Sequence, residues 1–422
     1  MSDARFLQIH TLTSYAGALL NRDDAGFAKR LPFGGATRTR VSSQCLKYHW
    51  RNHDGEHALY ELDVPASVRS RQTFRRKVAE PLIEDGLPQT LVACAARTLM
   101  EMILSDSKPS KATYKGILSG EEDLEQVLES NQVTILGEPE VRYLCQLVRE
   151  KVESLREELG LLWEDPDAKL SDEQVETAIE TFQAIAKGDL KKNLAGLALA
   201  AGLDAAMFGR MATSDALARG NAAVHVAHAF TTHAEESESD YFSAVDELKA
   251  ASGEGELGSG HINTSELNSG LFYGYVVVDV PLLVSNLEGC KREEWSDADR
   301  ELAGKVLERF IHLLATVSPG AKLGSTAPYA HSECVLVEAG SHQPRSLANA
   351  FRTPVATQPD VLGNSCQALA EHLRQLDDMY GRQTERKLSG TQPVEAIADA
   401  VGVEDTVPLD QAARWAADQV RR

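Results

Sequence analysis

The segment RFLQIHTLTSY, residues 5–15, alternates apolar and polar side chains, and the interpretation of the fold begins with it. Leu7 and Ile9 point to one side of an extended backbone, whereas Gln8 and His10 point to the other. Alternation of this kind predicts a β-strand with one buried face. We therefore expect a sheet that begins near the amino terminus.

Strand-like segments recur much later in the chain. They are AAVHVAHAFTTH (222–233), LFYGYVVVDV (271–280) and ECVLVEA (333–339). Between about residues 63 and 219 the apolar residues instead repeat at helical spacing, as at Leu91, Ala95, Leu99 and Met102. Strands at both ends and a helical block between them predict an α+β core whose sequence is interrupted by an insertion.

The composition is that of a globular protein with two or three structural units. The chain has 422 residues, of which 43% are hydrophobic and 25% charged. No stretch has the length of apolar sequence that a membrane helix needs, and the start MSDARFLQIH lacks the apolar region of a signal peptide. Six widely spaced cysteines without a C-x-x-C pair favour reduced thiols over a disulfide framework or a zinc site. We expect a cytoplasmic protein with no membrane contact.

The charge is unevenly distributed along the chain. The net charge of −20 disfavours nucleic acid as a partner at first sight, because Lys and Arg drive binding to phosphates. However, residues 1–80 carry a net charge of +5, and residues 121–190 carry −13. Exposed charges separated by more than about 10 Å are largely screened from one another. A local basic surface can therefore bind an anion despite the acidic total.

Two patterns that resemble ligand sites fail on their context. GEGELG, residues 253–258, has the G-x-G-x-x-G spacing, but no strand precedes it and no helix follows it, so a hairpin tip is the better interpretation. His225, His228 and His233 lie close in sequence. On a strand, His225 and His228 face opposite sides, so core or edge positions are favoured over a metal site.

Two other patterns bear on RNA. GLFYGYVV, residues 270–277, resembles the aromatic strand of RNA-recognition sheets, but its aromatic residues fit a sheet core equally well. The basic stretch 38–51 is a better indicator, although taken alone an ordinary solvated helix face remains the simpler interpretation. We expect a helix that starts at Ser42 and carries Lys47 and Arg51 on one face. Together with Gln44, this stretch combines short polar donors and cations. These are the groups that a protein needs to contact successive phosphates of a nucleic-acid backbone.

Nine motifs in a fixed order make the chain resemble a known family, the CasC (Cse4) backbone subunits of the type I-E CRISPR surveillance complex, Cascade, which are RAMP proteins. The motifs span most of the chain up to about residue 352. They are NRDD (21–24), FGG (33–35), RTRVSSQCLK (38–47), GRMATS (209–214), AHAFTTH (227–233), DYFSAVDEL (240–248), SGLFY (269–273), PGAK (319–322) and SLANAF (346–351). The sequence after about residue 355 contributes nothing to the resemblance.

The resemblance implies a hand-like architecture. Its palm is an RNA-recognition-motif (ferredoxin-like) core, assigned here to residues 1–62, 220–234 and 269–422, the last range including the C-terminal tail. A helical fingers insertion is assigned to residues 63–219, and a β-hairpin thumb to residues 235–268.

The resemblance also implies a function and its residues. Members of the family stack in several copies along the CRISPR RNA spacer and present it for pairing with target DNA. Carried over by motif, the RNA-binding residues are Asn21, Arg22, Ser42, Gln44, Lys47, Arg51, Met211, Tyr241, Phe242 and Ser243. No catalytic residue, metal or cofactor is implied. The implied partners are CRISPR RNA, target DNA through that RNA, further copies of the chain, and the large, small, Cas five-type and Cas six-type subunits of Cascade.

Two other functions remain open from the residues alone. One is a metal-independent RNA endonuclease of the related CRISPR processing proteins, in which His10 or His233 would act as general base. The other is an RNA-binding module that acts as a single copy.

Overall fold

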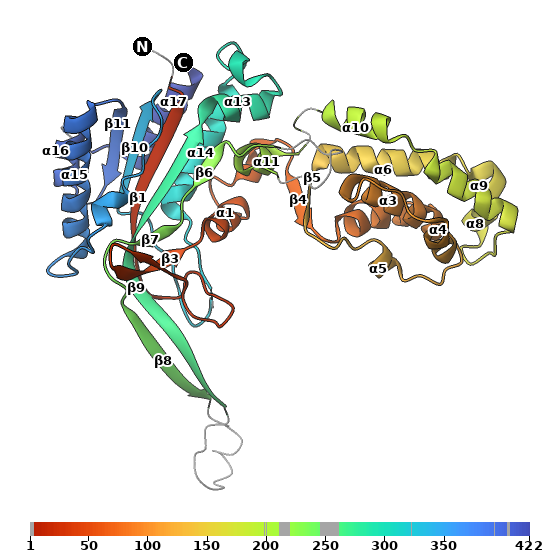
Figure 1. Cartoon of the computed structure of the whole chain (residues 1–422), viewed down its shortest axis with the longest axis horizontal. Coiled ribbons are helices and arrows are strands. Elements are labelled where there is room, and N and C mark those ends of the chain that lie inside the picture. Colours follow the sequence, from red (N-terminus) through yellow and green to blue (C-terminus); the bar gives the residue numbers. More distant parts are fainter. Residues whose placement is uncertain are drawn as a thin grey trace, which may run out of the picture. The chain divides into compact units, whose positions relative to one another are not determined.

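An antiparallel sheet organises the first of two units in the computed structural model, which describes residues 4–197, 199, 201–210, 220–244, 261–321, 323–391, 393–402 and 406–422. The strands follow the order β11, β10, β1, β9, β7, β3, β2, and β6 and β8 also pair with β9 (Figure 1). In chain order they are β1 (Phe6–Ala18), β2 (Arg30–Phe33), β3 (Ala36–Val41), β6 (Val224–Val226), β7 (Ala229–Thr231), β8 (Ser237–Ala244), β9 (His261–Asp279), β10 (Cys334–Gly340) and β11 (Glu385–Gly390).

The expected strand near the amino terminus is confirmed, and it lies inside the sheet. β1 pairs antiparallel with β10 on one side and with β9 on the other. Its polar residues are nevertheless buried, because Gln8 is 3% exposed and His10 is 1% exposed. The prediction that one face of this strand meets solvent is therefore wrong, since protein covers both faces.

Helices cover the two faces of this sheet (Figure 1). On one face Ile9 shares a small cavity with Trp50 and Leu314 of the covering helices. On the other face Tyr273 belongs to one core cluster with Phe351. The first face is covered by α1 (Ser43–Arg51) and α14 (Glu301–Thr316), with α17 (Leu409–Arg421) packed on α14; the second is covered by the 3₁₀ turn η4 (Ala348–Phe351), α15 (Val361–Tyr380) and α16 (Glu395–Val401).

A buried carboxylate joins several of these elements. Glu338 on β10 is fully buried and accepts hydrogen bonds from Arg345 at 2.7 and 2.9 Å, from Arg386 at 2.8 Å and from Thr384 at 2.8 Å. His10 Nε2 lies 3.1 Å from the same carboxylate. A charge that has left water must be paired and hydrogen-bonded, and this one has donors from β1, β11 and the loop after β10.

The hydrogen bonds around Glu338 determine its protonation. Burial alone would raise the pKa of Glu338, but hydrogen bonds from His10 and Arg345 hold that pKa well below its ordinary value. Burial lowers the pKa of His10, which favours the neutral ring. The other ring nitrogen of His10 lies 2.9 Å from the Tyr273 hydroxyl, and that hydroxyl also accepts from the Leu347 amide at 3.1 Å. Hydrogen bonds therefore link the Glu338 carboxylate through His10 and Tyr273 to the Leu347 amide.

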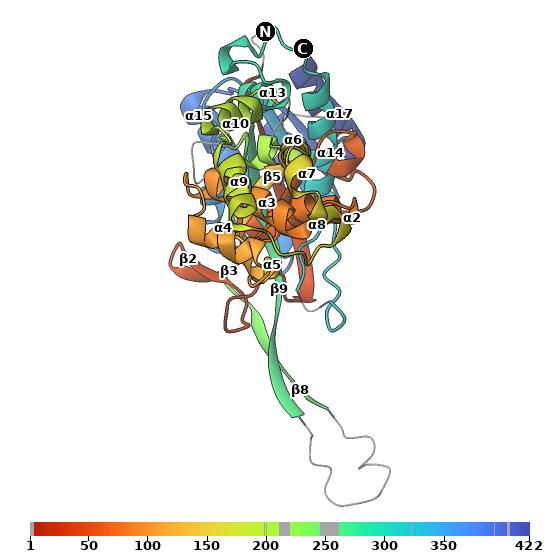
Figure 2. The same ribbon diagram turned by 90° about the vertical axis from the view of Figure 1, so that its right-hand side faces the viewer.

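A β-hairpin extends the sheet at one end. β8 pairs antiparallel with the first half of β9, from Ser237 opposite Asn268 to Ala244 opposite His261 (Figure 2). The second half of β9 then pairs with β1. One long strand therefore belongs to both the hairpin and the centre of the sheet.

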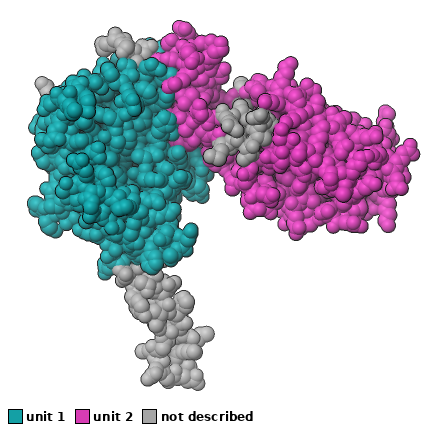
Figure 3. Space-filling model, viewed as in Figure 1, with its two compact units in different colours: residues 1–62, 224–281, 300–422 teal, residues 63–223, 282–299 magenta. Residues whose placement is uncertain are grey.

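The second unit comprises residues 63–223 and 282–299, and the first comprises residues 1–62, 224–281 and 300–422 (Figure 3). The core of the second unit is formed mainly by apolar side chains of α3 and of the helices packed on it, such as Leu91, Leu99 and Val148. Its helices are α2 (Glu80–Glu84), α3 (Gln89–Leu104), α4 (Lys111–Leu118), α5 (Leu124–Val127), α6 (Glu138–Glu153), α7 (Arg156–Leu159), α8 (Leu161–Glu164), α9 (Asp172–Gln183), α10 (Lys187–Ala195) and α11 (Leu203–Phe208), with a π-helical turn at Phe74–Ala79; α13 (Val280–Glu288) follows β9. No helix in the described ranges is long and apolar enough to cross a membrane.

The second unit also contains strands that the sequence did not reveal. β4 (Ser67–Ser70) and β5 (Thr134–Gly137) pair as a two-stranded sheet. Each has only four residues, which is too short for an alternation pattern to be read.

The assignment of residues 63–219 to fingers, of 235–268 to a thumb and of the remainder to a palm stays a prediction.

Replacing the buried carboxylate should destabilise the protein in a pH-dependent way. We expect Glu338→Gln to lower the free energy of unfolding by about 3–5 kcal/mol at neutral pH, because Arg345 then loses its counter-ion and Arg386 keeps only Asp377. The folded-state pKa of Glu338 is depressed, so its stabilisation is present above the ordinary glutamate pKa of about 4.3 and is lost as the pH falls through the folded value.

Urea unfolding at several pH values measures this effect. The difference between the wild type and Glu338→Gln should shrink on acidification. Glu371→Gln is the control, because Glu371 is exposed on α15 and should change stability by no more than about 0.5 kcal/mol. A difference that stays constant down to acid pH would contradict a depressed pKa.

Candidate nucleic-acid interface

Helix α1 carries three of the predicted RNA-binding residues, Gln44, Lys47 and Arg51, and it begins where the sequence indicates. Ser42 is the N-cap, and its hydroxyl accepts a hydrogen bond from the Cys45 amide. This arrangement satisfies one of the amides that a helix start leaves unpaired. Trp50 anchors the other end of α1, because its ring packs edge-on against Phe310 of α14 at 5.5 Å. The helix is therefore fixed at both ends.

The NRDD motif folds into a loop that contacts the start of α1. The side-chain oxygen of Asn21 accepts from the Ser42 amide at 2.9 Å. Asp23 closes the loop by accepting from the amides of Ala25 and Phe27. The structure thus brings together Asn21 and Ser42, which lie 21 residues apart. Arg22, in the same loop, is exposed.

One face of α1 presents polar and basic side chains. Gln44, Lys47 and Arg51 lie three and four residues apart and therefore share this face. Gln44 is exposed, whereas Lys47 and Arg51 are half-buried. Arg51 Nε donates to the main-chain oxygen of Lys47 at 3.2 Å. Tyr48 belongs to the same face and is 57% exposed, and the sequence reasoning missed it.

Further cations surround the amino-terminal end of α1. His228 Nδ1 accepts from the Ser43 amide at 2.8 Å. Partial desolvation of the exposed His228 ring, together with the positive charges of Arg40 and Lys29, lowers the pKa of His228. Arg40 and Lys29 therefore lie close enough to this ring to act on its charge. The partial positive charge of the helix start adds to theirs, so this surface attracts anions.

Arg38 does not belong to this surface, although it lies in the same basic stretch. It is fully buried and donates to the carbonyl oxygens of Thr231 at 2.9 Å, Thr232 at 2.8 Å and Phe351 at 2.8 Å. Burial lowers the pKa of its guanidinium. The expectation that the basic residues of 38–51 act together is therefore wrong for Arg38, whose role is to join β3 to β7 and η4.

The aromatic residues of β9 belong to the sheet core. Phe272 and Tyr273 are 4% and 1% exposed, and the Tyr275 hydroxyl donates to Gln8 at 2.9 Å. Tyr273 lies beneath η4 and α15. Of the two interpretations that the sequence left open for this strand, the structure supports the core, because bases cannot stack on covered rings.

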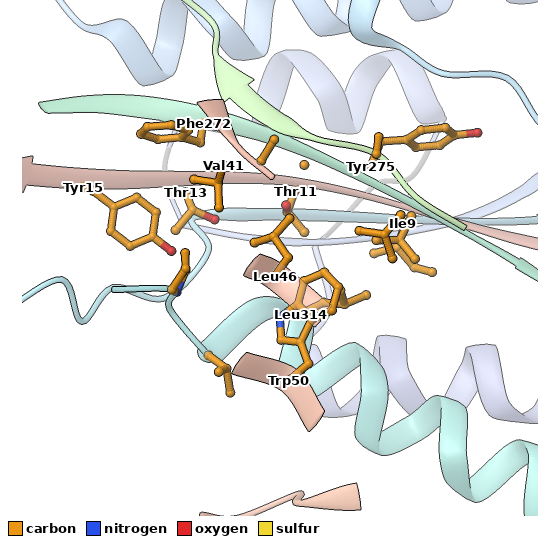
Figure 4. A pocket seen from close by; sticks show the side chains of 17 residues that line it. Ile9, Thr11, Thr13, Tyr15, Val41, Leu46, Trp50, Phe272, Tyr275 and Leu314 are labelled. Atoms are coloured by element: carbon orange, nitrogen blue, oxygen red, sulfur yellow. The ribbon is translucent and has the colours of Figure 1, made fainter. Parts of the chain in front are cut away.

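The opposite face of the sheet contains a cavity of about 50 Å³ beneath α1 (Figure 4). Leu46 and Trp50 of α1 and Leu314 of α14 point from the helices towards Thr11 and Phe272 of the sheet. A cavity of this size holds no more than one or two water molecules. It is a packing defect beneath the helix and not a ligand site.

The predicted residues of the hairpin lie on β8. Tyr241, Phe242 and Ser243 are opposite Thr264, Asn263 and Ile262 of β9. At the base of the hairpin, Glu266 accepts from the Ala28 amide at 2.8 Å and pairs with Arg30, which also pairs with Glu235. The hairpin base is therefore tied to the loop that contacts α1.

Some sequence-based predictions fall elsewhere. Met211 and the GEGELG segment lie outside the described residues. Arg210, which precedes Met211 in the GRMATS motif, is buried and donates to Glu140 at 2.6 and 2.8 Å. That part of the motif therefore serves the core of the second unit.

The three clustered histidines do not act together. His225 and His228 are exposed, whereas His233 is buried with Nδ1 2.7 Å from the Ala234 oxygen and Nε2 accepting from the Leu271 amide. Among the residues that the structure describes, no group of three or more His, Cys, Asp or Glu side chains is arranged to hold a metal ion. The six cysteines are free thiols.

Comparisons with known proteins agree with this fold. A family model described as CT1975-like protein matches residues 7–415. A solved structure described as "CRISPR RNA-guided surveillance complex, pre-nicking" aligns with a TM-score of 0.72 at 24% identity and covers 98% of this chain and 100% of that chain. Another, described as "CRISPR RNA-guided surveillance complex", aligns with a TM-score of 0.65 at 20% identity, covering 98% and 99%. The search of curated proteins gave no match. At these identities the structural likeness shows a shared mixed α/β fold with an antiparallel sheet.

The different positions of Arg38 and Arg40 generate a prediction. Arg38→Ala should lower the free energy of unfolding by about 3 kcal/mol or more, because four carbonyl oxygens lose a charged donor. Arg40→Ala should cost less than about 1 kcal/mol, because the Arg40 side chain is only partly buried. Chemical unfolding followed by circular dichroism measures both. Equal losses for the two variants would contradict the structural role of Arg38.

Proposed function

This chain belongs to the CT1975-like family, and from that membership we propose that it is a non-catalytic RNA-binding backbone subunit of a CRISPR surveillance complex. The structures that it resembles are described as CRISPR RNA-guided surveillance complexes. The nine motifs further favour the CasC type of subunit in a type I-E complex that serves antiviral defence. The proposed location is the cytoplasm, and no cofactor is involved.

The topology of the first unit supports a palm of the RNA-recognition type. In a βαββαβ core the strands take the order four, one, three, two. β10, β1, β9 and β7 lie in this order, and α1 and α14 occupy the two helical positions in the chain. The hairpin of β8 and β9 supports a thumb, and the helical second unit, which enters after residue 62, supports fingers.

The single observation that carries the proposal is the composition of the α1 surface. Gln44, Lys47 and Arg51 follow one helix face, and further cations lie at its start. These groups suit phosphate and sugar oxygens. The aromatic strand that reads bases in RNA-recognition sheets is buried here. A subunit that contacts backbone and leaves bases free can hold any spacer, while base pairing supplies the sequence choice.

The proposal includes the partners of such a complex. Copies of the chain would stack head to tail along CRISPR RNA, because a heterologous interface that does not close into a ring yields an open helix. Target DNA would join through pairing with the RNA. The remaining partners are the large, small, Cas five-type and Cas six-type subunits. In this scheme Met211 contacts bases, and Tyr241, Phe242 and Ser243 lie near a displaced nucleotide.

The endonuclease alternative is disfavoured by the positions of its candidate bases. His10 and His233 are 1% and 2% exposed. Both ring nitrogens of each are in hydrogen-bonding contact with other protein atoms. A general base must reach the hydroxyl whose proton it removes. Neither ring reaches the surface in this structure.

Charge reversal on α1 tests the proposal. We expect Lys47→Glu with Arg51→Glu to weaken binding to unrelated single-stranded RNAs equally. Alanine at each position should instead flatten the dependence of log K on log salt by roughly 0.7 per lost phosphate contact. Fluorescence anisotropy at several salt concentrations measures both effects.

The control is Lys291→Glu with Arg292→Glu, an exposed basic pair in the second unit that makes the same change in net charge. It should leave RNA affinity within about twofold, allowing for the small effect of a distant screened charge. RNA recovered after incubation, with and without divalent metal, should be intact. A loss that depends on RNA sequence would indicate base reading, and cleavage that disappears on replacing His10 or His233 would establish the enzyme instead.

A further inference from the structure

A groove beside α1 is not used by the function proposed so far. It lies between the carboxyl-terminal half of α1 and the segment 316–329, and its volume is about 320 Å³. That volume lies in the lower part of the range for sites that hold small molecules. Its lining includes Tyr48, His49 and Asn52 of the helix end, and Ser318, Leu323 and Tyr329 of the facing segment.

Exposed apolar side chains gather at this groove. Tyr48, Leu323 and Tyr329 are 57%, 59% and 77% exposed. Eight large hydrophobic side chains are more than half exposed in the described chain, and three of them line this one groove. Single exposed apolar residues need no explanation, but a cluster at a concave site indicates a ligand.

Hydrogen bonds fix the segment that carries Tyr329. The Ser318 hydroxyl donates to the Ala330 oxygen at 2.8 Å, and Thr326 closes the loop between them by donating to the Ala321 oxygen at 3.0 Å. The Ala321 amide donates to Leu19 at the end of β1. Gly320 packs tightly at the groove, since a Cβ there would lie 2.6 Å from Pro328. The facing wall is therefore formed before any ligand binds.

The chemistry of the groove favours an uncharged aromatic group. Its described lining contains no Lys or Arg, and Asp54 at its edge would repel a phosphate. Burial lowers the pKa of His49, and its Nε2 accepts from the Gly320 amide at 3.5 Å, which favours the neutral ring. Two exposed tyrosine rings offer stacking surfaces, and Asn52 and Ser318 add polar atoms. The cations lie outside the groove, on the adjoining face of α1.

We propose that this groove binds one nucleobase of the RNA strand whose phosphates follow α1, by stacking against Tyr48 and Tyr329. The inference rests on the proposed function, because it assumes that RNA passes along Lys47 and Arg51. Tyr48 lies between these two residues on the helix and so joins the phosphate-binding face to the groove. Stacking accepts every base, so this site preserves binding without sequence choice.

Binding of natural and abasic RNA tests the site. Tyr48→Ala with Tyr329→Ala should weaken binding of a natural single-stranded RNA by roughly 5- to 150-fold, which corresponds to about 1–3 kcal/mol for one stacked base. An abasic strand of the same length should bind the variant and the wild type equally. The salt dependence should not change, because no phosphate contact is lost. Tyr329→Phe should retain most of the affinity.

Tyr380→Ala is the matched control, because Tyr380 is 60% exposed at the end of α15 and does not line the groove. Unchanged affinity of the double variant for natural RNA would overturn the site, and so would an equal loss for abasic RNA. A loss of self-assembly with normal RNA affinity would assign the groove to a protein partner. If the groove alone is wrong, Lys47 and Arg51 still govern RNA binding; if the proposed function is wrong, charge reversal at those residues has no effect.

Discussion

The buried guanidinium of Arg38 is the constraint on which the position of the candidate interface depends. It binds the main-chain oxygens of β7 and η4, and α1 begins five residues further along the chain. The turn before it is equally constrained, because Gly34 has φ +61° and a Cβ there would lie 1.5 Å from the Arg352 oxygen. Only glycine permits this approach. The basic face of α1 is thus held in place by contacts that never reach the ligand.

The covering of the sheet explains why binding would use a helix and not the strands. α15 and α16 bury the aromatic face, and the Glu338 carboxylate fixes β1, β10 and β11 beneath them. On the opposite side α1 covers the sheet, and the outer surface of α1 adjoins the NRDD loop and the hairpin base. These elements offer amides, hydroxyls and cations, which suit a backbone. The net charge of −20 does not prevent this, because the positive charge is local.

Sequence patterns predicted the strands and helices with clear periodicity, namely β1, β9, β10, α1 and α3. They also placed Lys47 and Arg51 on one helix face. They did not show that Arg38 is buried and Arg40 only partly so. Both residues lie on the same face of β3, and the alternation of side chains does not show how deeply each position is buried. Parts of several family motifs meet at Arg38, and those parts maintain the fold. Tyr48 and Tyr329 escaped notice because 281 residues separate them and only folding makes them neighbours.

The region after residue 355 shows the limit of motif-based reasoning most clearly. It gave no resemblance, yet it supplies β11, α15 and α16, and Arg386 on β11 completes the donors of Glu338. An edge strand and its covering helices can be built from many sequences, provided that the apolar pattern and one charged partner are kept. Such elements therefore carry little family signal although the fold needs them.

The central claim is that copies of this chain assemble along RNA by contacting its backbone. Native mass spectrometry of the purified chain with single-stranded RNAs of increasing length tests it most directly. The account predicts that the number of bound copies rises in regular steps with RNA length, identically for unrelated sequences. One copy at every length, or a copy number that follows sequence and not length, would contradict it.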